Sequence, residues 1–145
     1  MIALLQRVSS ASVTVDSQII GEIEQGLLVF LAVQPEDTEA KAKRLAERVA
    51  TYRLFNDDND KMNLNVKQVD GDILVVSQFT LAADTNSGLR PSFTSTGKPG
   101  FSKQLYEYFC QQLREKGFKV PTGEFGADMK VALLNDGPVT FTLTI

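Results

Sequence analysis

The sequence of 145 residues contains no histidine, and this absence removes the most common catalytic base from consideration. Neither a Ser-His-Asp triad nor a Cys-His pair can form within the chain. Zinc bound by histidine is excluded as well, and a single cysteine cannot replace the missing ligands. If the protein is a hydrolase, its base must be a carboxylate, a metal-bound water molecule or a group of the substrate itself.

Cysteines and long apolar runs are also scarce. Cys110 is the only cysteine, so no internal disulfide can form, and we expect a reducing, cytoplasmic setting. Its position next to Phe109 in a helical pattern favours a small core residue over a nucleophile. No apolar run reaches the roughly 18 residues that a membrane span needs, and we expect no membrane partner. The first seven residues lack the order of a signal peptide and are typical of a strand.

The charge balance limits the size of any nucleic-acid contact. The formal net charge is −3 at pH 7, whereas a protein that holds a long duplex by its phosphates is usually basic. We therefore expect no DNA partner and only small, local contacts with RNA. The acidic and amide side chains at 56–60 have the oxygens of a calcium loop. They lack its glycine and its downstream glutamate, which favours an ordinary polar turn.

Hydrophobic periodicity predicts one α+β domain over residues 1–145, with a largely antiparallel, barrel-like sheet and two packed helices. The opening third is expected to form an antiparallel meander, and two separate strands are expected to close the chain around a turn at 135–138. The predicted strands lie at 2–8, 13–15, 18–23, 27–33, 129–134 and 139–145.

Two segments have the spacing of amphipathic helices. Asp37 or Thr38 can cap the first helix, and Pro99 and Gly117 suit the beginning and the end of the second. Charged residues occupy the other faces of the first helix, and we interpret them as a solvated surface rather than an RNA-binding stripe. The two predicted apolar stripes are Ala42, Leu45, Ala46, Val49 and Tyr52, and Phe101, Leu105, Tyr108, Phe109 and Leu113.

The stretch 72–81 begins as a buried strand and then turns polar. Its apolar first half predicts a strand that continues to Leu81, with Ser77 and Phe79 on one face and Gln78 and Thr80 on the other. Taken alone, the pattern favours a strand that emerges at the rim of the sheet, with its polar groups bonded to neighbouring loops.

A long polar loop follows at 83–97. Loops of this length are often functional, and Arg90 and Lys98 could contact a phosphate. A plain surface excursion explains the same residues equally well.

Two short motifs, taken together, resemble a known family. The segments Ser77–Leu81 and Asn135–Thr140 are similar to the paired signature of the D-aminoacyl-tRNA deacylases, also called D-Tyr-tRNA(Tyr) deacylases. The segments 6–8, 89–93 and 123–129 resemble the same family. The resemblance covers the full chain in order and without a large gap.

The resemblance implies a homodimer with its reaction site at the subunit interface. The family hydrolyses the ester that joins a D-amino acid to the terminal adenosine of tRNA, and it also removes glycine from alanine tRNA. It spares L-aminoacyl-tRNA and needs no metal or cofactor. The segment Ser77–Thr80 would line the pocket for the terminal adenosine and the ester. The Gly137-Pro138 peptide would be cis and would reach into the site of the other subunit.

Several roles follow as hypotheses. Gly137 and Pro138 would reject L substrates by main-chain crowding, because glycine lets the backbone come close to a ligand. The N–H groups of Phe79 and Thr80 are the candidate oxyanion donors. Thr80 could be a nucleophile, but no base is evident beside it, so we favour assistance by the terminal ribose 2′-hydroxyl.

Other site residues leave alternatives open. Ser77 and Gln78 are candidates for contacts with the adenosine or the ester, and Phe79 could stack on adenine or fill the core. Arg7 could steady the loop that contains Gly137 or form a surface salt bridge. Met129 is a candidate pocket wall, although a core position is more common. Two other functions remain, a non-catalytic module that binds the tRNA 3′ end and a general esterase for small esters.

Overall fold

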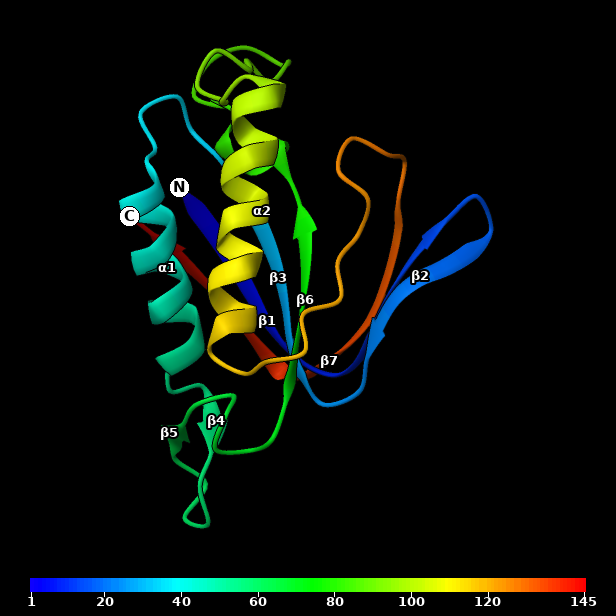
Figure 1. Cartoon of the computed structure of the whole chain (residues 1–145), viewed down its shortest axis with the longest axis vertical. Coiled ribbons are helices and arrows are strands. Elements are labelled where there is room, and N and C mark those ends of the chain that lie inside the picture. The colour runs from blue at the N-terminus through cyan, green and yellow to red at the C-terminus, as the bar shows by residue number, and fades with distance from the viewer.

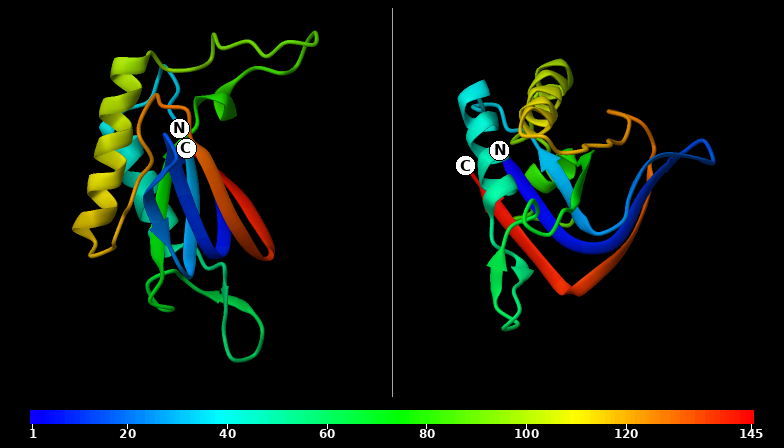
Figure 2. Two further views of the ribbon diagram at one scale, coloured as in Figure 1. Left: turned by 90° about the vertical axis from the view of Figure 1, so that its right-hand side faces the viewer. Right: turned by 60° about the horizontal axis from the view of Figure 1, so that its bottom comes forward.

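Two helices cover one face of a curled five-stranded sheet in the computed structural model, which describes residues 1–145 (Figures 1 and 2). This arrangement confirms the predicted α+β class, with the sheet curled into a half-barrel. The elements are β1 (Ile2–Val15), β2 (Gln18–Ile23), β3 (Gly26–Ala32), α1 (Glu39–Thr51), β4 (Phe55–Asn56), β5 (Met62–Leu64), β6 (Asp72–Ser77), the 3-10 turn η1 (Phe79–Ala82), α2 (Pro99–Glu115) and β7 (Lys130–Thr144).

The opening third is one long hairpin, so the predicted meander is wrong. Both β2 and β3 pair antiparallel with β1, and their register continues unchanged from the Ala11–Ile23 pair to the Val8–Gly26 pair. A two-residue turn, Asp16-Ser17, joins β1 to β2, and both residues have positive φ angles, as the twist of a tight hairpin requires. β1 therefore becomes the central strand along which the rest of the sheet is built.

β7 pairs along the other edge of β1 as a single strand, so the prediction of two closing strands joined by a turn is wrong. The pairing runs from Ile2–Thr144 to Thr14–Lys130, with register shifts around Val8. The chain does not reverse at 135–138. It bulges there, with the extra residues opposite Val8, and the segments before and after the bulge both pair antiparallel with β1. The predicted alternation after the bulge is confirmed, with Val139 and Leu143 buried and the threonines exposed.

β6 adds to β3 in parallel, which makes the sheet mixed. The strand ends at Ser77, so the prediction of a strand through Leu81 is wrong. Gln78 N–H donates to Leu31 O at 2.8 Å in the last bond to β3, because β3 itself ends one residue later. The chain then winds into η1, where Leu81 N–H donates to Gln78 O at 3.2 Å. Side chains in η1 therefore fan around an axis instead of alternating between two faces.

The two helices pack against the apolar face of the sheet. Thr38 caps α1 and accepts from Lys41 N–H at 3.2 Å, which decides between the two predicted caps. Pro99 begins α2 as predicted. The Tyr106 hydroxyl donates to Val75 O at 3.1 Å and so fixes α2 to β6. Most predicted stripe residues are buried, while Tyr52, Phe101 and Tyr108 are half-buried at the margin of the core.

Cys110 lies in the core between α2 and the sheet, as predicted. Its side chain is 1% exposed, and burial raises the pKa of its thiol to about 12. The thiol therefore stays protonated at neutral pH and cannot serve as a nucleophile.

The segment 56–60 forms the tip of the small β4–β5 hairpin, as an ordinary polar turn should. Asp57 accepts from the N–H groups of Lys61 at 3.1 Å and Asn59 at 2.8 Å. These backbone bonds hold the pKa of the Asp57 carboxyl below its usual range. Elsewhere in the chain, none of the helices is both long and apolar enough to cross a membrane.

Candidate active site

A cavity of about 310 Å³ opens where β6 ends beside the beginning of α2. Three of the predicted site residues, Ser77, Gln78 and Phe79, line it directly. They lie where β6 ends beside α2. Polar groups become accessible at this point because the hydrogen bonds between the strands stop there. The remaining lining residues are Leu31 from β3, Val33 just after β3, Thr96 and Gly97 from the long loop, Pro99, Ser102 and Tyr106 from α2, and Phe125 and Gly126.

The end of the long loop forms part of the cavity wall through Thr96 and Gly97. Gly97 N–H donates to Val33 O at 2.9 Å, which joins the loop to the strand end. A side chain at Gly97 would place its Cβ 2.6 Å from Ser102 Oγ. A side chain at this position would force the Ser102 hydroxyl or the loop to move, so glycine suits the close approach of the loop to α2.

Gln78 lines the cavity, and Thr80 lies beside it at the rim without lining the cavity itself. Gln78 Nε2 donates to Thr80 Oγ1 at 2.5 Å, and the Thr80 side chain is exposed. No carboxylate or lysine bonds to this hydroxyl. Because its partner is an amide donor, Thr80 has no group that could remove its proton.

η1 leaves two backbone donors at the same rim. Phe79 and Thr80 are its first residues, and neither N–H group has an acceptor within the protein, as expected at a helical N-terminus. Phe79 itself is 56% exposed, so the hypothesis that it fills the core is wrong. The rim therefore combines two free N–H groups with an exposed aromatic ring.

Arg7 is buried, and its closest polar contacts are hydrogen bonds to main-chain carbonyl groups rather than an ion pair. Its Nε donates to Asp136 O at 2.8 Å, and its Nη1 donates to Leu54 O at 2.9 Å and to Asn56 Oδ1 at 3.3 Å. The Asp136 carboxylate lies farther away, at 4.0 Å. Arg7 thus holds the bulge of β7 by its main chain, as the alternative hypothesis expected.

The bulge contains Gly137, whose peptide bond to Pro138 is cis. The φ angle of Gly137 is +153°, and a Cβ at this position would lie 2.6 Å from Val139 Cγ2. Asn135 closes the bulge from inside, because its Oδ1 accepts from Val139 N–H at 2.8 Å and its Nδ2 donates to Val139 O at 3.2 Å. The backbone here is held from both sides and leaves no room for a side chain at Gly137.

Within a single chain, the bulge at Gly137 lies apart from the cavity. β6, β3, β1 and β7 are successive neighbours, so three strand spacings, about 14 Å, separate Ser77 from the strand that contains Gly137. Neither Gly137 nor Pro138 lines the cavity. Met129 does not line it either, and it packs near Gly123 at the edge of a small apolar cluster.

Several lining residues carry no signal in the sequence, because they are spread over three segments with no shared period. Ser102 offered one signal, as a small polar residue among the apolar positions of α2 that the structure shows to be buried. Phe125 lies in a segment that the resemblance had marked. Its ring contacts that of Tyr106, with centroids 5.7 Å apart.

Comparisons with known proteins identify the family of the chain. The family described as D-Tyr-tRNA(Tyr) deacylase matches residues 4–144. The chain belongs to this family. D-aminoacyl-tRNA deacylases from Colwellia psychrerythraea and Yersinia enterocolitica are 77% and 60% identical to it, over the full length of both chains in each case. The resemblance inferred from the two motifs is therefore confirmed.

Solved structures share the fold. One, described as c-Myc DNA Unwinding Element Binding Protein, has a TM-score of 0.94 and 36% identity and covers 100% of this chain and 99% of its own. Another, described as a probable eukaryotic D-amino acid tRNA deacylase, has a TM-score of 0.85 at 17% identity. It covers 99% of this chain and 98% of its own, and at that identity it supports the fold alone.

Proposed function

We propose that the protein hydrolyses the ester of D-aminoacyl-tRNA, and of glycine mischarged on alanine tRNA, and releases the amino acid and intact tRNA. The observation that carries this proposal is the cavity built by Ser77, Gln78 and Phe79 in a chain that matches the deacylase family over residues 4–144. The cytoplasm is the proposed compartment, since the only cysteine is a buried free thiol.

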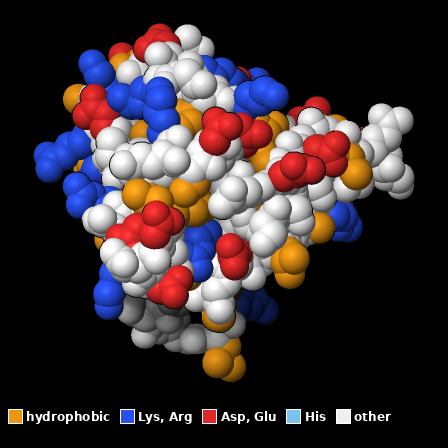
Figure 3. Space-filling view, turned by 90° about the horizontal axis from the view of Figure 1, so that it is seen from below, with side chains coloured by type: hydrophobic (Ala, Val, Ile, Leu, Met, Phe, Trp, Pro, Cys, Tyr) orange, Lys and Arg blue, Asp and Glu red, His pale blue; other side chains and the backbone are white.

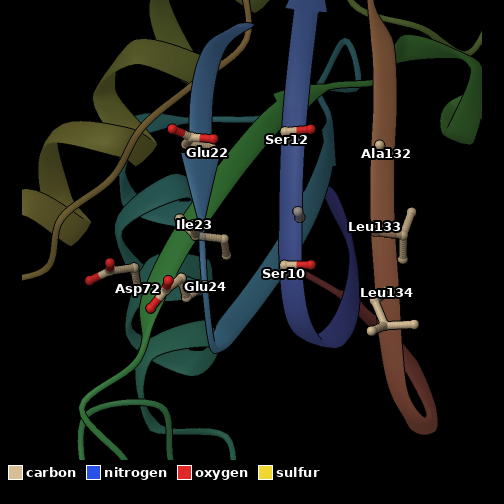
Figure 4. A pocket seen from close by; sticks show the side chains of 10 residues that line it. Ser10, Ser12, Glu22, Ile23, Glu24, Asp72, Ala132, Leu133 and Leu134 are labelled. Carbon is tan, nitrogen blue, oxygen red and sulfur yellow. The ribbon is translucent and has the colours of Figure 1, made fainter.

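The proposed partners are the tRNA 3′ end and a second copy of the chain. β7 bonds to β1 along one edge, which leaves a 15-residue strand edge unpaired. Leu134 on the same strand is 61% exposed beside a hollow of about 780 Å³ between β2, β1 and β7 (Figure 4). A second copy could cover these groups and bring its own Gly137-Pro138 to the cavity of the first.

Chiral selection would come from the main chain of Gly137 and Pro138. Arg7 and Asn135 hold this backbone in place, so it can exclude a side chain by crowding rather than adapt to it. A substrate of L configuration would direct its side chain into the backbone, whereas a D side chain would point away. Glycine has no side chain, so a filter of this kind must admit it.

The chemistry would rely on the substrate as much as on the protein. Water attacks the ester carbonyl carbon, the bond to the ribose oxygen breaks, and that oxygen takes up the proton as the free acid leaves. The N–H groups of Phe79 and Thr80 would stabilise the oxyanion, an effect of about 10²-fold or more per donor. The adjacent 2′-hydroxyl would orient the water or assist its attack, which suits a site without a protein base.

Contacts with the tRNA body are expected to be few. Acidic and basic side chains are interspersed on the face seen from below (Figure 3), and the chain has a net charge of −3. Binding would therefore centre on the unpaired 3′ end.

A comparison of D-Tyr-tRNA with L-Tyr-tRNA tests the proposed function. Release of free tyrosine from the D ester alone is the expected result. Loss of neither ester would indicate a non-catalytic module that binds the tRNA 3′ end, and equal loss of both would indicate an unselective esterase.

A further inference from the structure

Two exposed aromatic rings lie side by side at the mouth of the cavity. The ring centroids of Phe79 and Phe93 are 5.2 Å apart, with an angle of 56° between the planes. The two residues are 56% and 45% exposed. Phe79 lines the cavity, whereas Phe93 contacts the Phe79 ring without lining the cavity itself.

Phe93 is held in place by its own loop, which projects from the end of the sheet (Figure 2). Asp84 and Ser92 exchange two backbone hydrogen bonds, of 2.8 and 2.9 Å, which pinch the base of the loop. Thr96 N–H donates to Phe93 O at 3.1 Å, and Thr96 Oγ1 donates to the same oxygen at 2.7 Å. The backbone that presents the ring is therefore ordered before any ligand binds.

The charge around the aromatic pair is opposite in sign to that of the whole chain. Residues 77–103 contain three cationic side chains and one carboxylate, whereas the chain has a net charge of −3. One of the three cations, Lys103, pairs with Glu107 at 3.9 Å, which leaves Arg90 and Lys98. Arg90 and Lys98 form no ion pair. Asp84, the one acid, accepts from Asn86 N–H at 2.9 Å. A polyanion suits this surface better than an apolar peptide does.

We infer that Phe93, together with Phe79, forms a stacking platform for the base that precedes the terminal adenosine. This inference rests on the proposed function. The cavity, at about 310 Å³, is at the small end of ligand sites and suits the terminal adenosine with its amino acid. The rest of the RNA strand therefore lies outside the cavity, where the exposed Phe79 and Phe93 rings offer it a surface. Every base has a π-face, so stacking on Phe93 accepts any base. The positive charge of Arg90 and Lys98 favours the phosphates of the same strand.

Substrates of two lengths test the platform. D-tyrosyl-adenosine occupies the cavity alone, while D-tyrosyl-CCA adds the preceding nucleotides. We expect wild-type protein to favour the trinucleotide in kcat/KM, and we expect Phe93→Ala to reduce this preference by roughly tenfold, mainly through KM. Phe93→Tyr should restore it. Ile20→Ala is the matched control, because Ile20 is 44% exposed on the distant β2, and it should leave the preference unchanged.

Two outcomes would overturn the inference, namely an unchanged preference in Phe93→Ala or an equal loss on both substrates. If wild-type protein hydrolyses neither ester, the proposed function fails instead. Equilibrium binding of uncharged CCA and of adenosine then tests the platform by itself. Weaker binding of CCA alone to Phe93→Ala would support it, and equal affinity of the variant and the wild type for CCA would contradict it.

Discussion

Arg7 donates from Nε to the carbonyl oxygen of Asp136 at 2.8 Å, while its Nη1 donates to Leu54 O at 2.9 Å. One buried side chain thus joins the central strand to the bulge of β7 and to the segment after α1. The bulge contains Gly137 and Pro138, so Arg7 fixes the part of the backbone that we propose as the chiral filter.

Loss of Arg7 should damage both stability and selectivity. Arg7→Ala removes the donor from the buried bond to Leu54 O and from the part-buried bond to Asp136 O, so we expect a loss of about 3 kcal/mol in the free energy of unfolding, measured with urea. A displaced filter should also reduce D-Tyr-tRNA hydrolysis by roughly tenfold to a hundredfold. Arg53→Ala is the control, since Arg53 is exposed and bonds only to Asn63 Oδ1. Unchanged D-Tyr-tRNA hydrolysis and an unchanged D-to-L ratio in folded Arg7→Ala would argue against the proposed role of Arg7 in holding the filter.

The α-ammonium group of Met1 lies 2.6 Å from Asp37 Oδ1, and both side chains are buried. Asp37 Oδ2 also accepts from Gln34 N–H at 2.7 Å. Asp37→Asn keeps the shape but removes the charge opposite the ammonium, so the free energy of unfolding should fall by about 3 kcal/mol. Asp128→Asn is the control, because its pair with Lys130 is exposed and should cost less than about 1 kcal/mol. Equal losses in the two variants would contradict this account.

Gly97 sets the distance between the long loop and α2. Gly97→Ala forces a shift against Ser102 Oγ, so we expect a higher KM and a loss of about 1–3 kcal/mol in stability. Adding Ser102→Ala removes the clashing oxygen and should restore part of both. Gly100→Ala is the control, since no atom lies within 4 Å of a Cβ there. If Gly97→Ala and Gly100→Ala behave alike, the cavity does not depend on this approach.

No base lies beside Thr80, so assistance by the ribose 2′-hydroxyl and nucleophilic attack by Thr80 lead to different expectations. Thr80→Ala should retain hydrolysis within about tenfold, because it keeps the backbone N–H. A D-tyrosyl ester on a terminal 2′-deoxyadenosine should lose nearly all turnover, because the assisting hydroxyl is missing. Single-turnover rates measure both. The opposite pattern, an inactive Thr80→Ala with full turnover of the deoxy substrate, would restore threonine as the nucleophile.

The helices and the alternating strands could be predicted from the sequence, because burial follows local periodicity. Thr38, Pro99 and the stripe of α1 carry their own signals in cap chemistry and spacing. The end of β6 could not be predicted in this way. It depends on where β3 stops, and β3 is far from β6 in the sequence. Phe79 is also a residue type that is common in strands, although it lies in a 3-10 turn.

The bulge at 135–138 was misread for a related reason. Asn, Asp, Gly and Pro are turn formers in any local reading, yet here the pairing of β7 with β1 on both sides keeps the strand direction. The separation of Gly137 from Ser77 within one chain follows only from strand order. The two motifs together identified the family, but only the fold shows where the motifs lie relative to each other.

The most direct test of the central claim is complementation between two damaged variants. We expect each variant alone to lose most D-Tyr-tRNA hydrolysis. The Cβ of Gly137→Ala would clash with Val139 and displace the filter backbone, and Gln78→Ala removes an amide group that lines the cavity. If each site combines the cavity of one copy with the filter of another, a refolded equal mixture contains mixed dimers with one intact site. D-Tyr-tRNA hydrolysis should then recover to about a quarter of the wild-type rate by random pairing. A mixture no more active than the average of the two variants alone would contradict a shared site.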